Sequence, residues 1–196
     1  EMFNKIKSVV ISDGITTIGA YAFTSCSFVE SISIPESLIN ISGGAFSGCA
    51  RLEKIDIPES VTTIGSGAFE NCSSLKSIIL PSKINSISDR TFYNCSSLKN
   101  ITIPDNVNTI GDYAFSGCSL LKSIVIPKNV YSIGLAFDGC TNLATITFLR
   151  DSTTIYSSPH NKPRHLGACN RNRFFGANLV NPQRNHAPAR AHYIPV

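Results

Sequence analysis

The 196-residue sequence predicts a β-rich solenoid with coils of 23 residues, and three observations support this fold class. Cysteines recur every 23 residues, with the last one residue early, at Cys26, Cys49, Cys72, Cys95, Cys118 and Cys140. A phenylalanine precedes each of them by three residues, and a leucine or valine follows each by three residues. A fixed period of this length is typical of proteins in which one structural unit is copied and stacked.

Each coil is expected to begin with a short β-strand. In the third coil, Ile55 and Ile57 alternate with Lys54 and Asp56, which places the isoleucines on one face and the charged residues on the other. Pro58 has no N–H group and a fixed φ, so the strand ends there. The equivalent residues predict one parallel sheet of about seven short strands, at 9–11, 32–34, 55–57, 78–80, 101–103, 124–126 and 146–148.

A second apolar pair follows the proline in each coil, as at Val61 and Ile64, and predicts a second, shorter parallel sheet. Glycine or serine then turns the chain toward the phenylalanine, which follows an alanine everywhere except at Thr91. A coil of 23 residues encloses too little volume to bury these apolar residues alone. The core is therefore expected to form by stacking of neighbouring coils.

Charge and composition divide the chain near Tyr156. Residues 1–149 hold 10 Lys and Arg against 12 Asp and Glu, whereas residues 150–196 hold 7 against 1 and contain all four histidines. The apolar period also stops there. We therefore expect the solenoid to occupy residues 1–156, and residues 157–196 to form a basic tail, rich in Pro, Asn, Arg and His, that is disordered or loosely packed.

Membrane insertion of this segment is not expected, because no apolar run approaches the roughly 18 residues needed to span a bilayer. The chain begins at Glu1 without a charged-then-apolar leader. We therefore expect either that a signal peptide has been removed or that the chain is an internal piece of a longer protein.

The segment Leu75–Cys95, LKSIILPSKINSISDRTFYNC, and its counterparts resemble the BspA-like, Treponema-type leucine-rich repeats. Period, proline, Ala-Phe pair and cysteine agree together over residues 6–155. The resemblance implies a leucine-rich-repeat solenoid from a cell-surface or secreted protein of a bacterium or a mucosal protist. It also implies adhesion to host extracellular matrix proteins or to other cell-surface proteins and glycans, and it supplies no general catalytic residues.

The cysteines of the repeats are expected to be buried, reduced thiols. They occur one per coil, without the paired ligands of a metal site, and stacked parallel side chains do not readily meet the dihedral angle of a disulfide. Other leucine-rich repeats have Asn at this position, where a weak S–H donor can help to satisfy the turn. No metal site is therefore expected in the repeats. The pair His165 and Cys169 in the tail has metal-ligand spacing if it is helical, and stays an open alternative.

Enzymatic activity is not expected, and neither is a cofactor. Nucleophilic catalysis needs a nucleophile, a base and an orienting group within hydrogen-bond reach, and every histidine lies in the tail. The rigid part of the chain therefore offers no catalytic set. We expect a non-enzymatic binding or adhesion module.

The outward side of the predicted strands is the candidate binding surface. Lysines of three adjacent coils stand in one column, and the columns beside them are mostly hydroxylated with two apolar residues near the centre. The predicted ligand-binding residues are Lys76, Ile79, Lys99, Thr102, Lys122 and Val125. Such a surface suits an acidic protein or a sulfated glycan, and it is too flat for a small molecule.

Three alternatives stay open. The lysines could form an ordinary solvated face. The coils could be spacers in a long cell-surface stalk whose ligand contacts lie elsewhere. The basic tail could bind nucleic acid or an anionic surface, but it lacks a regular alternation of basic and aromatic residues, so a nucleic-acid partner is not expected.

Overall fold

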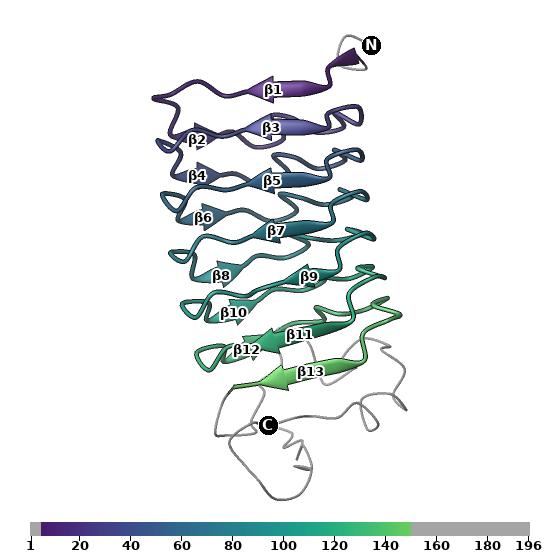
Figure 1. Cartoon of the computed structure of the whole chain (residues 1–196). Helices are drawn as coiled ribbons and strands as arrows, with labels where there is room; N and C mark the ends of the chain where they lie inside the picture. Colours follow the sequence, from purple (N-terminus) through teal and green to yellow (C-terminus); the bar gives the residue numbers. More distant parts are fainter. Residues whose placement is uncertain (1–4, 150–196) are drawn as a thin grey trace, which may run out of the picture.

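The computed structural model describes residues 5–149, which form a β-solenoid whose coils stack one above another (Figure 1). Each coil places one strand in a wide ladder. These strands are β1 (Ser8–Val10), β3 (Ser31–Ser33), β5 (Lys54–Asp56), β7 (Ser77–Ile79), β9 (Asn100–Ile101), β11 (Ser123–Ile126) and β13 (Thr145–Phe148). They pair in parallel, as β1-β3, β5-β7-β9 and β11-β13. The prediction of seven short parallel strands is confirmed.

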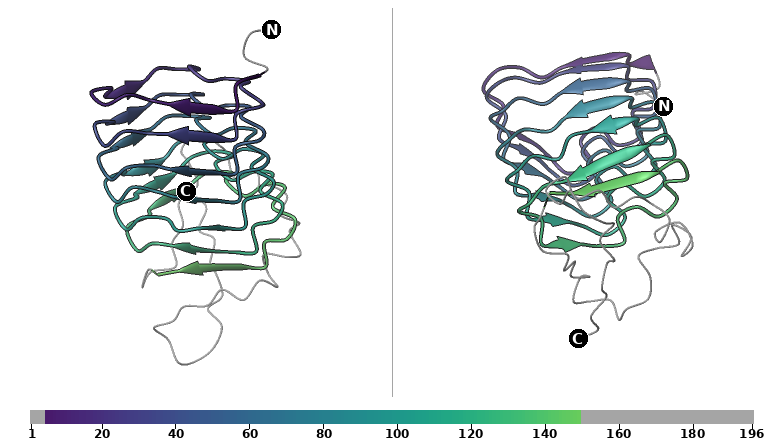
Figure 2. Two further views of the ribbon diagram at one scale, coloured as in Figure 1. Left: turned by 45° about the horizontal axis from the view of Figure 1, so that its top comes forward. Right: turned by 60° about the horizontal axis from the view of Figure 1, so that its bottom comes forward.

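A second ladder of two-residue strands runs through the segment after each proline. Its members are β2 (Thr17–Ile18), β4 (Asn40–Ile41), β6 (Thr63–Ile64), β8 (Ser86–Ile87), β10 (Thr109–Ile110) and β12 (Ser132–Ile133). They pair as β2-β4-β6 and β8-β10-β12, also in parallel. The two ladders lie on different sides of the stack (Figure 2). This second sheet is also as predicted.

The predicted strand bounds were wrong by one residue, because every wide strand begins one residue earlier than expected. The alternation of apolar residues marks Ile55 as the first inward position, but main-chain pairing already begins at Lys54, opposite Ser77. The register itself advances by one whole coil, so that Ile55 lies opposite Ile78 and Ile78 opposite Ile101. Side-chain pattern therefore located the strands, whereas hydrogen bonding sets where each one starts.

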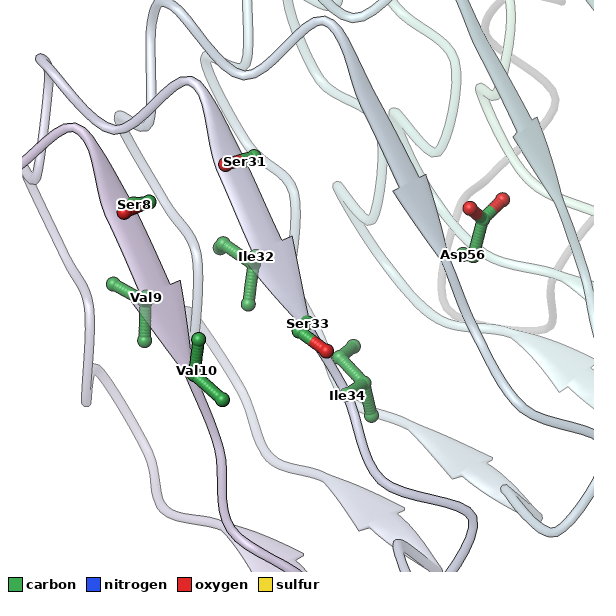
Figure 3. Close-up of a pocket in the computed structure, with 8 residues that line it drawn as sticks. All are labelled: Ser8, Val9, Val10, Ser31, Ile32, Ser33, Ile34 and Asp56. Carbon is green, nitrogen blue, oxygen red and sulfur yellow. The ribbon is translucent and has the colours of Figure 1, made fainter.

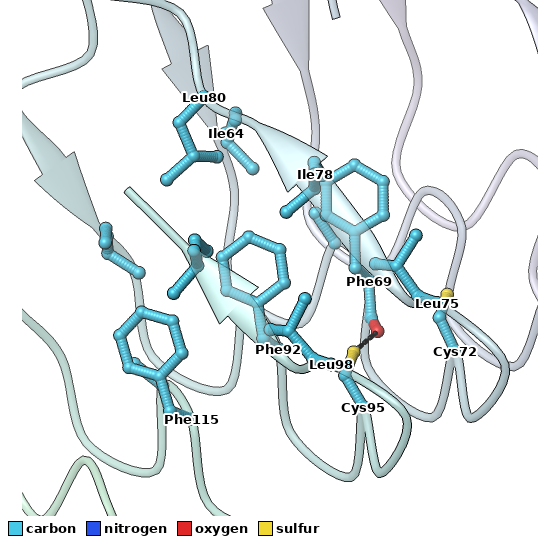
Figure 4. Close-up of a cluster of buried hydrophobic side chains, with 14 of the residues drawn as sticks. Ile64, Phe69, Cys72, Leu75, Ile78, Leu80, Phe92, Cys95, Leu98 and Phe115 are labelled. Atoms are coloured by element: carbon cyan, nitrogen blue, oxygen red, sulfur yellow. Dashed lines mark hydrogen bonds between the residues drawn. The ribbon is translucent and has the colours of Figure 1, made fainter. Parts of the chain in front are cut away.

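A ladder of phenylalanine rings runs through the core. Phe46, Phe69, Phe92 and Phe115 are fully buried, and neighbouring rings are stacked with centroids 5.4–5.7 Å apart (Figure 4). Parallel strands lie only about 4.8 Å apart. Main-chain hydrogen bonds join the coils at the phenylalanines too, as from the Phe92 N–H to the Ala114 oxygen at 2.8 Å, so the rings stack because the backbones that carry them are paired.

The six cysteines of the repeats are free and buried, as predicted. Each thiol from Cys49 onward donates to the carbonyl oxygen of a phenylalanine in the preceding coil, and Figure 4 shows the bond of 3.1 Å from Cys95 to Phe69. The same Phe69 oxygen accepts the N–H of Cys72 at 3.2 Å. Each thiol therefore donates to the second lone pair of a buried carbonyl oxygen, which water does not reach.

The predicted boundary near Tyr156, the tail 157–196 and the pair His165 and Cys169 lie outside the described residues.

Candidate binding surface

The cysteine ladder offers no reactive nucleophile at neutral pH. Burial raises the pKa of the Cys49 thiol to about 12, with a smaller contribution from the neighbouring Cys26. Burial likewise raises the pKa of Cys72, Cys95 and Cys118. Since the thiolate is the form that attacks and that binds metals, these residues serve the fold.

The six residues predicted for ligand binding all lie exposed on the wide ladder. Ile79 is 71% exposed at the end of β7, and Val125 is 48% exposed within β11. Thr102 follows β9 directly and lies in the coil between them. We call this set, Lys76, Ile79, Lys99, Thr102, Lys122 and Val125, the strand surface.

The three lysines of the strand surface are not equivalent. Lys76 forms an ion pair with Glu53 of the preceding coil, with 2.6 Å between its Nζ and the carboxylate oxygen. Within residues 5–149, Lys99 and Lys122 take part in no ion pair. The net positive charge of the strand surface is therefore concentrated at Lys99 and Lys122.

Charges on the earlier coils of the same face are compensated. Lys54 pairs with Asp56 at 2.9 Å, and Lys7 approaches Glu30 to 3.9 Å. All of these side chains are exposed, so each pair adds little stability, but each cancels a charge that a ligand would otherwise meet. The face thus changes along the stack, from neutral in the first coils to basic in the fifth and sixth.

A hollow of about 330 Å³ lies at the first coils of the wide ladder, away from Lys99 and Lys122 (Figure 3). Serine and aliphatic residues of β1 and β3 line it, together with Asp56 of β5. Asp56 is the only titratable residue among them, and it is paired with Lys54. The hollow therefore holds no set of groups suited to acid–base or nucleophilic chemistry.

A second polar surface, which sequence analysis missed, lies on the turn before the phenylalanine of each coil. One position of this turn has a positive φ in five successive coils, and it is Gly44 or Gly67 in two of them. In the others it is Tyr21, Arg90 or Tyr113, with φ of 54° to 58°. A side chain at such a φ costs roughly 1 kcal/mol relative to glycine. Three coils thus carry a large side chain where glycine would be less strained.

Arg90 and Tyr113 meet on this turn. The guanidinium of Arg90 lies over the ring of Tyr93, 5.6 Å from its centroid, and over that of Tyr113, at 5.7 Å. Two aspartates directly precede them in the sequence: one oxygen of Asp89 accepts the N–H of Asp112 at 2.8 Å, and one oxygen of Asp112 accepts the N–H of Leu135 at 2.9 Å. These bonds hold the two carboxylates in place.

We call Glu70, Asp89, Arg90, Asp112, Tyr113 and Asp138 the turn surface; Glu70 and Asp138 directly follow a phenylalanine of the ladder, and the other four residues precede one. It carries four carboxylates and one guanidinium, a net charge of −3. Aligning the coils at the 23-residue interval would have revealed the turn surface. The column that holds Gly44 and Gly67 in two coils holds Arg90 and Tyr113 in the next two.

Residues 5–149 show neither a metal-binding cluster nor a membrane-spanning helix. They contain no group of three or more His, Cys, Asp or Glu side chains placed to hold a metal ion. In the same range, no helix is long and apolar enough to cross a membrane.

Known structures share this architecture. A leucine-rich repeat protein from Eubacterium ventriosum is 27% identical, with a TM-score of 0.69 over 85% of this chain and 47% of that one. A leucine rich repeat protein of T. pallidum is 32% identical, with a TM-score of 0.68 over 71% of this chain and 68% of that one. A leucine rich cell surface protein from Faecalibacterium prausnitzii, 23% identical, has a TM-score of 0.53 over 74% of this chain and 60% of that one, and shows likeness of fold.

This chain thus spans about half the length of the E. ventriosum protein. No curated protein matches it at a significant level. The family model of the BspA type leucine rich repeat region matches in six copies, over residues 2–122 and 110–163. The protein belongs to the family of BspA type leucine-rich repeat proteins.

Proposed function

We propose that this chain is a non-enzymatic binding module of a cell-surface or secreted protein, and that its strand surface contacts an acidic protein or a sulfated glycan of the host matrix or of another cell. One observation carries the proposal. Lys99 and Lys122 remain without an ion-pair partner within residues 5–149, whereas the other lysines of this ladder are compensated. An anionic ligand would supply the missing charge.

The neighbours of these lysines support contact with an extended partner. Parallel strands are about 4.8 Å apart, so Lys99 and Lys122 can meet successive anionic groups of one extended ligand. Ile79 and Val125 lie exposed beside them, where an apolar contact would add affinity that salt does not screen. Opposite charge at the rim of an interface mainly raises the association rate and fixes register.

The same observation argues against a pure spacer in this part of the stack. A spacer needs only a uniformly hydrated outer face, and the first coils, with their paired charges, satisfy that description. The fifth and sixth coils do not, because they present Lys99 and Lys122, which form no ion pair within the described part of the chain, together with an exposed Val125. We therefore assign the binding role to these later coils and a spacing role to the earlier ones.

The test is the variant Lys99→Glu with Lys122→Glu, assayed for adhesion to immobilised heparin and to extracellular matrix at low and physiological salt. We expect adhesion to fall at least tenfold and its salt dependence to flatten, because screening acts on the removed charges. The matched control is Lys83→Glu with Lys128→Glu, which makes the same change in net charge at two exposed lysines of the turns after the prolines. Equal adhesion of the two variants would return the strand surface to an ordinary solvated face.

A further inference from the structure

We propose that the turn surface of one chain docks on the strand surface of a second copy, so that copies associate side by side. A second copy of the chain is the partner because the two surfaces carry opposite charge. The turn surface carries a net charge of −3, and the strand surface is basic at Lys99 and Lys122. Each copy presents one surface of each sign.

Both surfaces repeat with the same period along the stack. Lys99 and Lys122 occupy equivalent positions of adjacent coils, and so do Asp89 and Asp112. A charge match made at one coil is therefore repeated at the next when two stacks lie alongside. Main-chain hydrogen bonds join neighbouring coils at the turns as well, for example from the Arg90 N–H to the Asp112 oxygen at 2.9 Å, so both surfaces repeat at about the strand spacing of 4.8 Å.

The carboxylates of the turn surface are positioned before any partner arrives. Asp89 and Asp112 each use one oxygen to accept a main-chain N–H of the following coil. A carboxylate has a second oxygen with its own lone pairs, which can accept from a lysine ammonium. Because the first bond already restricts these side chains, little further side-chain entropy is lost on docking.

The centre of the contact is aromatic and apolar. Arg90 lies between the rings of Tyr93 and Tyr113, and tyrosine and arginine are the residues that most often anchor protein interfaces. Their counterparts on the strand surface are the exposed Ile79 and Val125. The strained φ of Arg90 and Tyr113 is retained where glycine would be less strained, as expected for side chains kept for contact.

A contact between two different surfaces forms an open row unless the rotation between neighbouring copies closes a ring. Each added copy leaves one free strand surface and one free turn surface, so association continues in a row. The individual contacts are weak and salt-dependent, because exposed charges are screened beyond about 8 Å at physiological ionic strength. Within a row the neighbouring copy covers the strand surface of every copy but one, so self-association and binding of an anionic ligand to that surface compete.

Sedimentation equilibrium of the full chain tests this at about 20 mM and about 500 mM salt. We expect the weight-average mass to exceed 21.1 kDa increasingly with concentration at low salt, and to return toward that value at high salt. The strand variant, Lys99→Glu with Lys122→Glu, and the turn variant, Glu70→Lys with Asp138→Lys, are each expected to stay monomeric. Within residues 5–149 Glu70 and Asp138 accept hydrogen bonds from the neighbouring coil through their main-chain oxygens, from Gly48 and Gly117, which the substitutions keep. Circular dichroism checks that both variants fold.

A mixture of the two variants makes the test specific. An equimolar mixture of the two variants should form a heterodimer and nothing larger, because one intact surface of each kind remains. The control Lys83→Glu with Lys128→Glu should associate like the wild type.

Three results would overturn the proposal: a monomeric wild type at low salt, a mixture without heterodimer, or a strand variant that still associates like the wild type. The last would place the cationic partner elsewhere, for example among the basic residues 150–196. Adhesion separates this proposal from the function proposed above, since the turn variant should lose self-association and still bind heparin.

Discussion

Replacement of Phe92 by alanine tests whether the phenylalanine ladder holds the coils together. Phe92 is fully buried, and its ring stacks on Phe69 at 5.7 Å and on Phe115 at 5.5 Å. Replacing a buried phenylalanine by alanine lowers the free energy of unfolding by about 3–5 kcal/mol. Each stacked pair of aromatic rings contributes roughly 0.5–1.5 kcal/mol to stability. With two pairs lost, we expect a decrease of about 4 kcal/mol in the free energy of unfolding.

Phe23 provides the matched comparison at the end of the ladder. Its ring is only half-buried and stacks on one neighbour, Phe46, at 5.6 Å. Phe23→Ala should therefore cost about half as much, on the order of 2 kcal/mol. Because each coil contacts only its neighbours, the Phe92 variant should also uncouple the two halves of the stack, and the Phe23 variant should only fray one end.

Urea unfolding followed by far-UV circular dichroism measures both effects. For Phe92→Ala we expect a lower midpoint and a broadened or two-step transition, and for Phe23→Ala a single transition with a smaller shift. If Phe23→Ala destabilises the protein as much as Phe92→Ala does, the nearest-neighbour account of the ladder is wrong.

Two further predictions concern the thiols and the left-handed turns. Burial raises the pKa of Cys49 to about 12, against 9.0 for an ordinary thiol, so this thiol keeps its proton in the folded state. Its contribution to stability is therefore complete below pH 9.0 and is lost as the pH rises from 9.0 toward 12, because the unfolded chain loses the proton first. Urea midpoints across this range should fall, and native thiol labelling at pH 8 should leave the six repeat cysteines unmodified; prompt labelling of most of them would contradict their burial. Asn94 has a φ of 56°, so Asn94→Ala should cost about 1 kcal/mol whereas Asn94→Gly should be nearly neutral, and equal midpoints for the two variants would show that the backbone there is unstrained.

The direction in which each side chain points could be predicted from the sequence, because in a stack of copied coils it depends on local alternation. The same columns of residues recur every 23 positions, so Ile55, Phe69 and Cys72 had to face the core wherever their counterparts did. Proline marked the strand ends for a similarly local reason, the missing N–H. Inward and outward positions, the two sheets and the burial of the thiols therefore followed from pattern alone.

Which neighbour a side chain contacts was decided only by the tertiary structure. Lys76 has Glu53 on one side of its column and Lys99 on the other, and its ammonium group binds Glu53, so that Lys99 forms no ion pair among residues 5–149. The acceptor of each thiol, 25 or 26 residues away, depends on how the coils are offset when they stack. Arg90 likewise meets Tyr113 only because two turns with positive φ bring them together. Contacts of this kind depend on side-chain rotamers and coil-to-coil offsets, which a one-dimensional pattern does not contain.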